Sequence, residues 1–152
     1  MNKVRHTAPQ EAAGPKMKQI RCIAWNVRGW RGERSERGKI RRIKGEIEDY
    51  DIFILTETHL SADAKVIDKF EQNMPEFLLF HAHAEGNQAS ARLGVTIGVR
   101  KTLTDRDRIS VSTEEAGEKG RWLRLTITGV LPKPLHTWGV YAPAGKVAAR
   151  KQ

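Results

Sequence analysis

A charged residue ends an apolar stretch at positions 51–60, which read DIFILTETHL. Four apolar residues precede the carboxylate of Glu57, and a threonine lies on each side of it. A carboxylate at the mouth of a buried strand costs free energy unless a cation, a helix N-terminus or a bound metal compensates its charge. Asn26 closes the earlier apolar stretch IRCIAWNV (20–27). These two side chains are the first candidates for a site that performs chemistry.

The elements around these stretches decide whether the two side chains can meet. Residues 20–27 and 51–57 are rich in β-branched and aromatic residues, which predicts two strands. Apolar residues recur at helical spacing over 40–50, which predicts a helix between the strands. A βαβ unit of this kind has parallel strands, whose carboxyl ends meet at one edge of the sheet. We therefore expect the amide of Asn26 and the carboxylate of Glu57 to lie side by side.

The basic loop 28–37 leaves the sheet at the same edge, and this permits two interpretations of Glu57. A hard divalent cation, Mg²⁺ or Mn²⁺, could bridge the carboxylate to a phosphate that the basic residues attract. Alternatively, Glu57 is a strand-end carboxylate paired with a neighbouring arginine or lysine. The residues alone leave both interpretations open.

Positive charge dominates the chain, whose formal net charge is +9, from 27 Lys and Arg against 18 Asp and Glu. Such a balance favours polyanionic partners, most often nucleic acid. Basic residues gather over 28–44, although a solvated helix face with a loop explains this run equally well. The candidates for contact with nucleic acid are Arg28, Trp30, Arg31, Arg34 and Lys39. Trp30 could stack on a base or a sugar, or it could cover the end of the helix.

The rest of the chain predicts a run of strands rather than further βαβ units. After a weak helix around 61–73, we expect strands at 77–82, 93–99, 108–112, 120–128 and 136–142. This order favours an α/β sandwich with mixed sheets over a doubly wound parallel fold. The domain organisation that we expect is a disordered leader at 1–17, one domain over 18–145 and a tail at 146–152.

Several side chains receive a structural interpretation. We expect Trp25, Trp122 and Trp138, which lie inside predicted strands, to belong to the core. His81 and His83 alternate at a strand end without an acidic pair or a cysteine beside them, which indicates surface residues.

The composition also narrows the setting of the protein. No apolar run approaches the about 20 residues needed to cross a bilayer, and no apolar stretch follows the basic N-terminus as in a secretory signal. Cys22 is the single cysteine, which excludes an internal disulfide and fits a reducing compartment. We expect its thiol to be buried and the protein to be intracellular, in the nucleus or the cytoplasm.

Five segments occur in an order that resembles the endonuclease/exonuclease/phosphatase superfamily. They are IAWNVRG, DIFILTETHL, LGVTIGV, RWLRLTITG and WGVYAPAG. In particular, residues 18–145 resemble the apurinic-type endonuclease domains of retrotransposon reverse transcriptases. The resemblance implies a DNase I-like α/β sandwich with mixed sheets and a hydrolase that acts on DNA with Mg²⁺ or Mn²⁺. It also implies a retroelement origin and fusion to a reverse transcriptase in the full-length gene.

The resemblance assigns roles to three residues. Glu57 matches the metal-binding glutamate of the family, and Asn26 matches the asparagine of its phosphate and metal site. Tyr141 matches the tyrosine whose hydroxyl lies against the scissile phosphate. Outside the family context, Tyr141 is a half-buried strand aromatic with its hydroxyl at the surface. His59 follows the glutamate in many relatives, and for it we expect packing or loop orientation rather than catalysis.

The second half of the family pattern is missing. In the family it supplies an Asp-x-Asn motif, whose aspartate orients the attacking water, and a late Asp-His pair, and the 152 residues contain neither. We therefore expect an incomplete N-terminal half that holds a metal but is inactive alone. Two alternatives remain: a catalytically inactive remnant that binds nucleic acid, and a phosphatase of the same superfamily acting on phosphoinositides or sphingolipids.

Overall fold

A computed structural model describes residues 19–30, 36–86, 92–113 and 120–142. The elements are β1 (Cys22–Asn26), α1 (Glu36–Ile47), β2 (Ile52–Thr56), α2 (Ala64–Glu71), β3 (Phe77–Ala82), β4 (Val95–Arg100), the 3₁₀ turn η1 (Arg106–Arg108), β5 (Ile109–Thr113), β6 (Trp122–Ile127) and β7 (Leu135–Val140). None of the helices within these ranges is long and apolar enough to cross a membrane.

The strands form two sheets. The first has the order β1-β2-β4-β3, with β1 and β2 parallel and the other neighbours antiparallel. The unit β1-α1-β2 is therefore the predicted βαβ unit. The second sheet is antiparallel, with the order β5-β6-β7. This arrangement confirms the predicted α/β fold with a mixed sheet.

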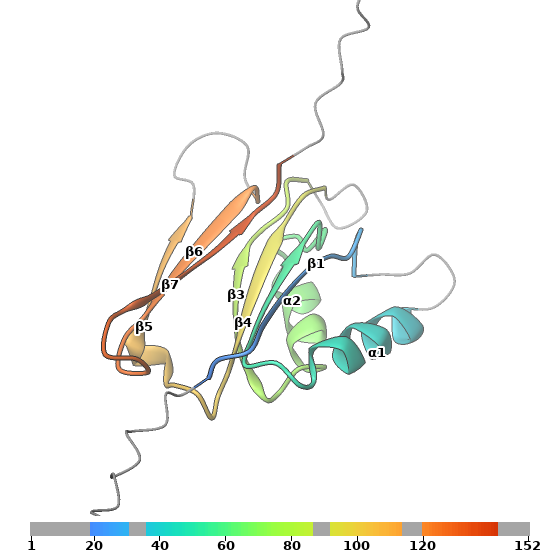
Figure 1. Ribbon diagram of the computed structural model, residues 1–152. Helices are drawn as coiled ribbons and strands as arrows, with labels where there is room; N and C mark the ends of the chain where they lie inside the picture. Colours follow the sequence, from blue (N-terminus) through green and yellow to red (C-terminus); the bar gives the residue numbers. More distant parts are fainter. Residues whose placement is uncertain (1–18, 31–35, 87–91, 114–119, 143–152) are drawn as a thin grey trace, which may run out of the picture.

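The elements stack in three layers (Figure 1). Helices α1 and α2 cover one face of the first sheet, and the second sheet packs against the opposite face. The cluster under the helices includes Ile43, Phe53 and Phe70, whereas the cluster between the sheets includes Ile97 and Leu125. Because β2 and β4 lie between two covered faces, both read as nearly continuous apolar runs in the sequence.

Both helices follow from local sequence rules. Helix α1 buries Ile40, Ile43 and Ile47, which lie three and four residues apart, and exposes Arg41 and Lys44. The carboxylate of Asp63 caps α2 by accepting hydrogen bonds from the backbone N–H groups of the next helical turn. This cap explains why α2 begins later than the predicted helix over 61–73.

Two expectations about burial are wrong because the sheets are covered unevenly. The Trp138 side chain is 51% exposed, since it lies on the face of the second sheet that points away from the first. Its neighbour Trp122 on β6 stacks against it and is half-buried, with the ring centroids 5.7 Å apart. Cys22 is exposed, because β1 is an edge strand in the described part of the first sheet. Trp25, on the other face of β1, is half-buried beside α1.

The expectation that His81 is a surface residue is also wrong. Its side chain is 6% exposed, with Nε2 lying 3.0 Å from Glu71 Oε1. Its Nδ1 lies 2.9 Å from Thr96 Oγ1, and its ring packs edge-on against Phe70. Burial lowers the pKa of His81 to about 4, so the ring is neutral at neutral pH. The cause is α2, which lies over this end of β3, and His83 is half-buried beside His81.

Candidate functional site

The carboxyl ends of β1 and β2 bring Asn26 and Glu57 together. In the parallel register Asn26 pairs with Thr56, so the residue after β2 lies beside the last residue of β1. The side-chain amide Nδ2 of Asn26 donates a hydrogen bond to Glu57 Oε1 at 3.0 Å. The predicted juxtaposition of these two side chains is confirmed.

The backbone after each strand holds these side chains in place. The side-chain oxygen of Asn26 accepts from the backbone N–H of Arg28 at 3.1 Å, a local turn that directs the amide N–H group toward Glu57. Parallel pairing continues beyond β1, since Gly29 N donates to the carbonyl of Glu57 at 2.5 Å. Arg28 and Glu57 have φ angles of 49° and 53°, which are uncommon for residues with a side chain. Such outliers often mark functional sites.

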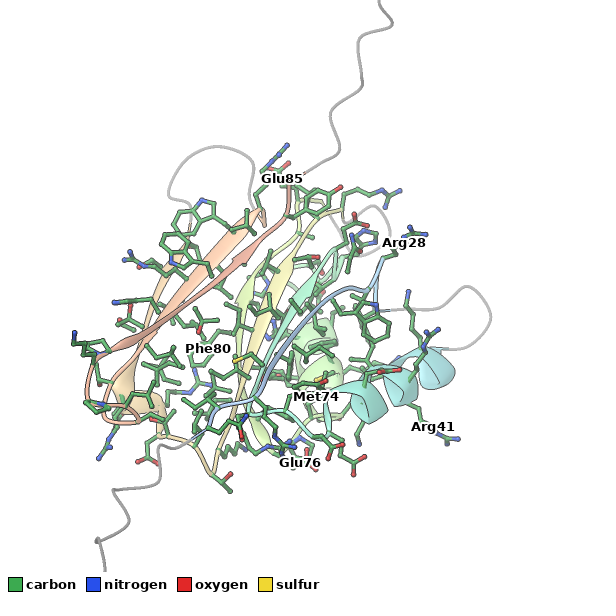
Figure 2. The ribbon with its side chains drawn as sticks, viewed as in Figure 1. Arg28, Arg41, Met74, Glu76, Phe80 and Glu85 are labelled. Carbon is green, nitrogen blue, oxygen red and sulfur yellow. The ribbon has the colours of Figure 1, made fainter. Side chains whose placement is uncertain are left out.

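Tyr141 reaches the same site from the second sheet. It follows β7, and its backbone N–H donates to the carbonyl of Arg121 at 2.7 Å. A hydrogen bond between its side chain and Glu57 is the largest cause that raises the pKa of Tyr141. The predicted cluster of Asn26, Glu57 and Tyr141 at one edge is therefore present. Figure 2 shows Arg28 projecting from this edge of the molecule.

The neighbours of Glu57 decide how its charge is compensated. An amide and a phenol, both neutral, contact the carboxylate. Among the described residues, no arginine or lysine forms an ion pair with it. This leaves the carboxylate charge unneutralised by a cationic side chain of the described residues, which is a favourable electrostatic setting for a bound cation.

The side chains at this site could hold Mg²⁺ or Mn²⁺, which keep water ligands, but they are too few to enclose a metal ion completely. Glu57 offers hard carboxylate oxygen atoms, and Asn26 lies beside it with its oxygen accepting from the backbone N–H of Arg28. The described residues contain no group of three or more His, Cys, Asp or Glu that could hold a metal. Mg²⁺ keeps several waters and is usually held by one or two carboxylates together with phosphate oxygens of the substrate. One carboxylate and one amide at an open edge meet that requirement.

His59 packs under the loop that follows β1. A Cβ atom at Gly29, whose φ is 81°, would lie 3.0 Å from Nδ1 of His59, so only glycine fits this approach. Burial is the largest influence on the pKa of His59 and lowers it, although the nearby Glu57 carboxylate acts in the opposite direction. This position fits the expected role of His59 in packing.

The predicted DNA-contacting residues differ in where they lie. Arg28 is exposed at the site, and its carbonyl accepts from Nζ of Lys39 at 3.0 Å. Trp30 is 1% exposed and packs edge-on against Phe70, with the ring centroids 5.4 Å apart. Stacking of Trp30 on a base is therefore wrong, and the ring is a core residue. The side chains of Arg31 and Arg34 lie outside the described residues.

A groove of about 650 Å³ adjoins the site between β1 and α1. It is lined by Trp25, Asn26, Val27, Arg28, Gly38, Lys39 and Arg42. Sequence reasoning missed Trp25 and Arg42 as parts of this surface. The available signal was the three-residue spacing of Lys39 and Arg42 on the helix, which places them on one face.

The layer arrangement matches solved enzymes that process DNA. An AP endonuclease from Leishmania major matches with a TM-score of 0.62 and 18% identity, over 80% of this chain and 40% of that one. A 3′ phosphatase from Neisseria, bound to a product DNA hairpin, matches with a TM-score of 0.53 and 17% identity, over 81% and 41% of the two chains. The chain has a DNase I-like fold. This confirms the predicted fold.

A third DNase I-like structure, a 3′-5′ exonuclease from Neisseria meningitidis, has a TM-score of 0.50 and 18% identity over 78% of this chain and 40% of that one. The chain thus spans about 40% of the length of these structures. No family model matches the sequence, and no curated protein matches it.

Replacing Glu57 by glutamine should lower the pKa of Tyr141. The Glu57 carboxylate accepts the phenol hydrogen bond and repels a phenolate, so both effects favour the neutral phenol, and both are lost in Glu57→Gln. Ultraviolet titration in a Tyr50→Phe background, where Tyr141 is the single tyrosine, measures the change. Glu46→Gln, at an exposed position on α1, is the matched control and should leave the titration unchanged. An unchanged midpoint in Glu57→Gln would show that the two side chains do not interact.

Proposed function

We propose that the chain is the metal- and phosphate-binding part of an endonuclease-like phosphodiesterase domain that acts on DNA with Mg²⁺ or Mn²⁺. The observation that carries this proposal is the convergence of Asn26 and Glu57 from the first sheet with Tyr141 from the second sheet, beside a basic groove. The names of the similar structures, an AP endonuclease and a 3′ phosphatase bound to a DNA hairpin, support DNA as the substrate.

Each residue has a distinct role in this proposal. Glu57 holds the cation through its carboxylate, and the cation supplies charge neutralisation at the phosphate when bound. The Asn26 amide and the Tyr141 hydroxyl, which both contact Glu57, are donors that can turn to phosphoryl oxygens. Arg28 adds positive charge at the same edge.

The hydrolytic step needs groups beyond these. The 152 residues contain no Asp-x-Asn motif and no Asp-His pair, which in the resembling family orient the water and act at the phosphate. In this proposal residues 18–145 are the N-terminal half of the domain, flanked by a leader at 1–17 and a tail at 146–152. The missing groups come from sequence further downstream.

The proposal also covers the evolutionary origin of the domain, the gene that encodes it and its location in the cell. The ordered segments of the sequence support a retroelement-derived domain, fused to a reverse transcriptase in the full-length gene and acting in the nucleus or the cytoplasm. Reading the genomic sequence beyond codon 152 tests this extension. An in-frame Asp-x-Asn motif followed by a reverse transcriptase supports it, and an immediate stop codon in intact genomic sequence contradicts it.

The affinity for Mn²⁺, used as a calorimetric substitute for Mg²⁺, tests the metal site. Loss of a carboxylate ligand should weaken binding by about tenfold or more in Glu57→Gln, because even the partners that only orient a ligand are worth ~10–100-fold. The exposed Glu46→Gln should bind as the unmodified chain does. Equal affinity in all three proteins would refute the proposed site.

Inactive nucleic-acid binding is the second candidate function, favoured by the missing motifs and the basic groove. It predicts DNA affinity that falls steeply with salt and does not depend on divalent cation or on Glu57. A DNA affinity that rises with Mg²⁺ in the unmodified chain but not in Glu57→Gln would favour the metal-dependent function instead.

Phosphatase activity is the third candidate, favoured by the similar 3′ phosphatase structure. Phosphate release from a 3′-phosphorylated DNA end, compared with release from phosphoinositide and sphingolipid substrates, separates it from the leading proposal. The assay uses a chain extended into the downstream sequence.

A further inference from the structure

We propose that the groove between β1 and α1 binds a phosphate that flanks the one at Glu57, and that Arg42, whose guanidinium lies over the Trp25 ring, is the residue that binds it. The inference rests on the proposed function and deepens it, because it specifies the class of substrate. A molecule with a single phosphate would fill only the site at Glu57. A polynucleotide strand would fill both positions.

The groove is continuous with the site. Asn26 lines the groove and also donates to Glu57, so the two share a residue. From Asn26 and Arg28 the groove extends past Lys39 to Arg42, one helical turn further along α1. Its volume of about 650 Å³ is in the range of sites that hold ligands of nucleotide size.

The charge of the groove is of one sign. Arg28, Lys39 and Arg42 contribute three cations, and none of the described residues that line it is acidic. A second cavity, of about 440 Å³, is also bordered by α1, but there Glu48 and Glu76 accompany the basic residues. A groove lined by one sign of charge concentrates the electrostatic field and attracts a polyanion. The groove, and not the second cavity, therefore suits phosphates.

Arg42 is held in an orientation that suits a phosphate. Its guanidinium carbon lies 5.5 Å from the centroid of the Trp25 ring, a cation–π contact. Contact with the ring restrains the guanidinium, whose planar set of N–H donors matches phosphate oxygens. Within the described residues, no carboxylate forms an ion pair with Arg42. The charge is thus free of a competing anion there.

Lys39 connects helix α1 to the loop that follows β1. Its Nζ donates to the carbonyl of Arg28, which ties the first turns of α1 to the loop at the site. A strand that leaves the phosphate at Glu57 would pass Arg28 and Lys39 before it meets Arg42. Arg41, which directly precedes Arg42 in α1, extends on the side of the helix away from Arg28 (Figure 2) and lines the second cavity. Arg41 therefore lies outside this path.

Arg41 and Arg42 form a matched pair for the test, since they are adjacent on one helix and carry the same charge. The probe is a fluorescein-labelled DNA duplex of ~20 base pairs, and anisotropy gives its affinity over a series of NaCl concentrations in EDTA. Arg42→Gln should weaken binding about threefold to tenfold and reduce the slope of log affinity against log salt by about 0.9, the value for one lost phosphate contact. Arg41→Gln should leave both quantities unchanged.

A further variant separates the charge of Arg42 from the planar shape of its guanidinium. Arg42→Lys keeps the charge but not the planar guanidinium, so it should retain the salt slope and show an intermediate affinity. EDTA removes the divalent cation, so this experiment can fail while the metal titration succeeds, and the reverse. Equal losses in Arg41→Gln and Arg42→Gln, or no loss in Arg42→Gln, would overturn the proposed subsite.

Discussion

Supercoiled plasmid DNA incubated with the chain and Mg²⁺ should be nicked at no more than a trace rate, equal to that of a Glu57→Ala variant. Glu57 can hold a cation, but phosphodiester hydrolysis also needs an oriented water and a stabilised leaving oxygen. Loss of one such group typically costs ~10²–10⁴-fold in rate. The 152 residues contain neither the Asp-x-Asn motif nor the Asp-His pair, so at least two groups are absent, and their combined effect is not a simple sum.

The nicking assay needs a folded protein to be informative. Cooperative unfolding of residues 18–152, followed by circular dichroism, establishes this before the assay begins. Robust nicking by the unmodified chain that disappears in Glu57→Ala would contradict the expectation. It would show that these residues activate water with a group that the family pattern does not identify.

Trp30→Ala should lower the free energy of unfolding by about 3–5 kcal/mol, the usual cost of truncating a buried tryptophan or phenylalanine. Trp30 is 1% exposed and packs on Phe70 of α2, so its ring holds the loop after β1 against the helix layer. Domains of this size have only about 5–15 kcal/mol of stability in total. Urea denaturation followed by circular dichroism measures the loss.

Trp138→Ala is the matched control for this substitution. Trp138 is 51% exposed, and its contacts are the ring of Trp122 and the guanidinium of Arg124. Aromatic and cation–π contacts at exposed sites are worth about 0.5–1.5 kcal/mol, so the loss should be in that range. If the two variants lose equal stability, the assignment of Trp30 to the core is wrong.

The central part of the fold and of the site was predictable because it depends on local periodicity and one topological rule. Enrichment in β-branched and aromatic residues indicated the first two strands, and helical apolar spacing indicated α1. Parallel pairing of β1 with β2 then required Asn26 and Glu57 to meet. Tyr141 came from the family order of segments. Its residue type and spacing gave no reason to place it beside Glu57, since β7 belongs to a different sheet.

The errors concern which face of each element is covered, a property of the layers rather than of any segment. Trp30 and Trp138 have the same chemistry, yet one lies under α2 and the other on an open sheet face. His81 is buried because α2 lies over the end of β3, which its alternating strand pattern does not show. The contact of Arg42 with Trp25 likewise depends on how α1 crosses the edge of the sheet.

The most direct test of the metal site is the position of bound Mn²⁺, measured by paramagnetic broadening in ¹H–¹⁵N nuclear magnetic resonance spectra. Small additions of Mn²⁺ should first remove the side-chain amide signal of Asn26 and the backbone signals of Glu57 and Tyr141. Signals around Glu71 and His81, where a partly exposed carboxylate lies 3.0 Å from a buried histidine, should persist at the same concentration. Broadening centred on Glu71, or on Glu46 and Glu48 at the C-terminal end of α1, would contradict the proposed site if the Asn26 and Glu57 signals stay intact.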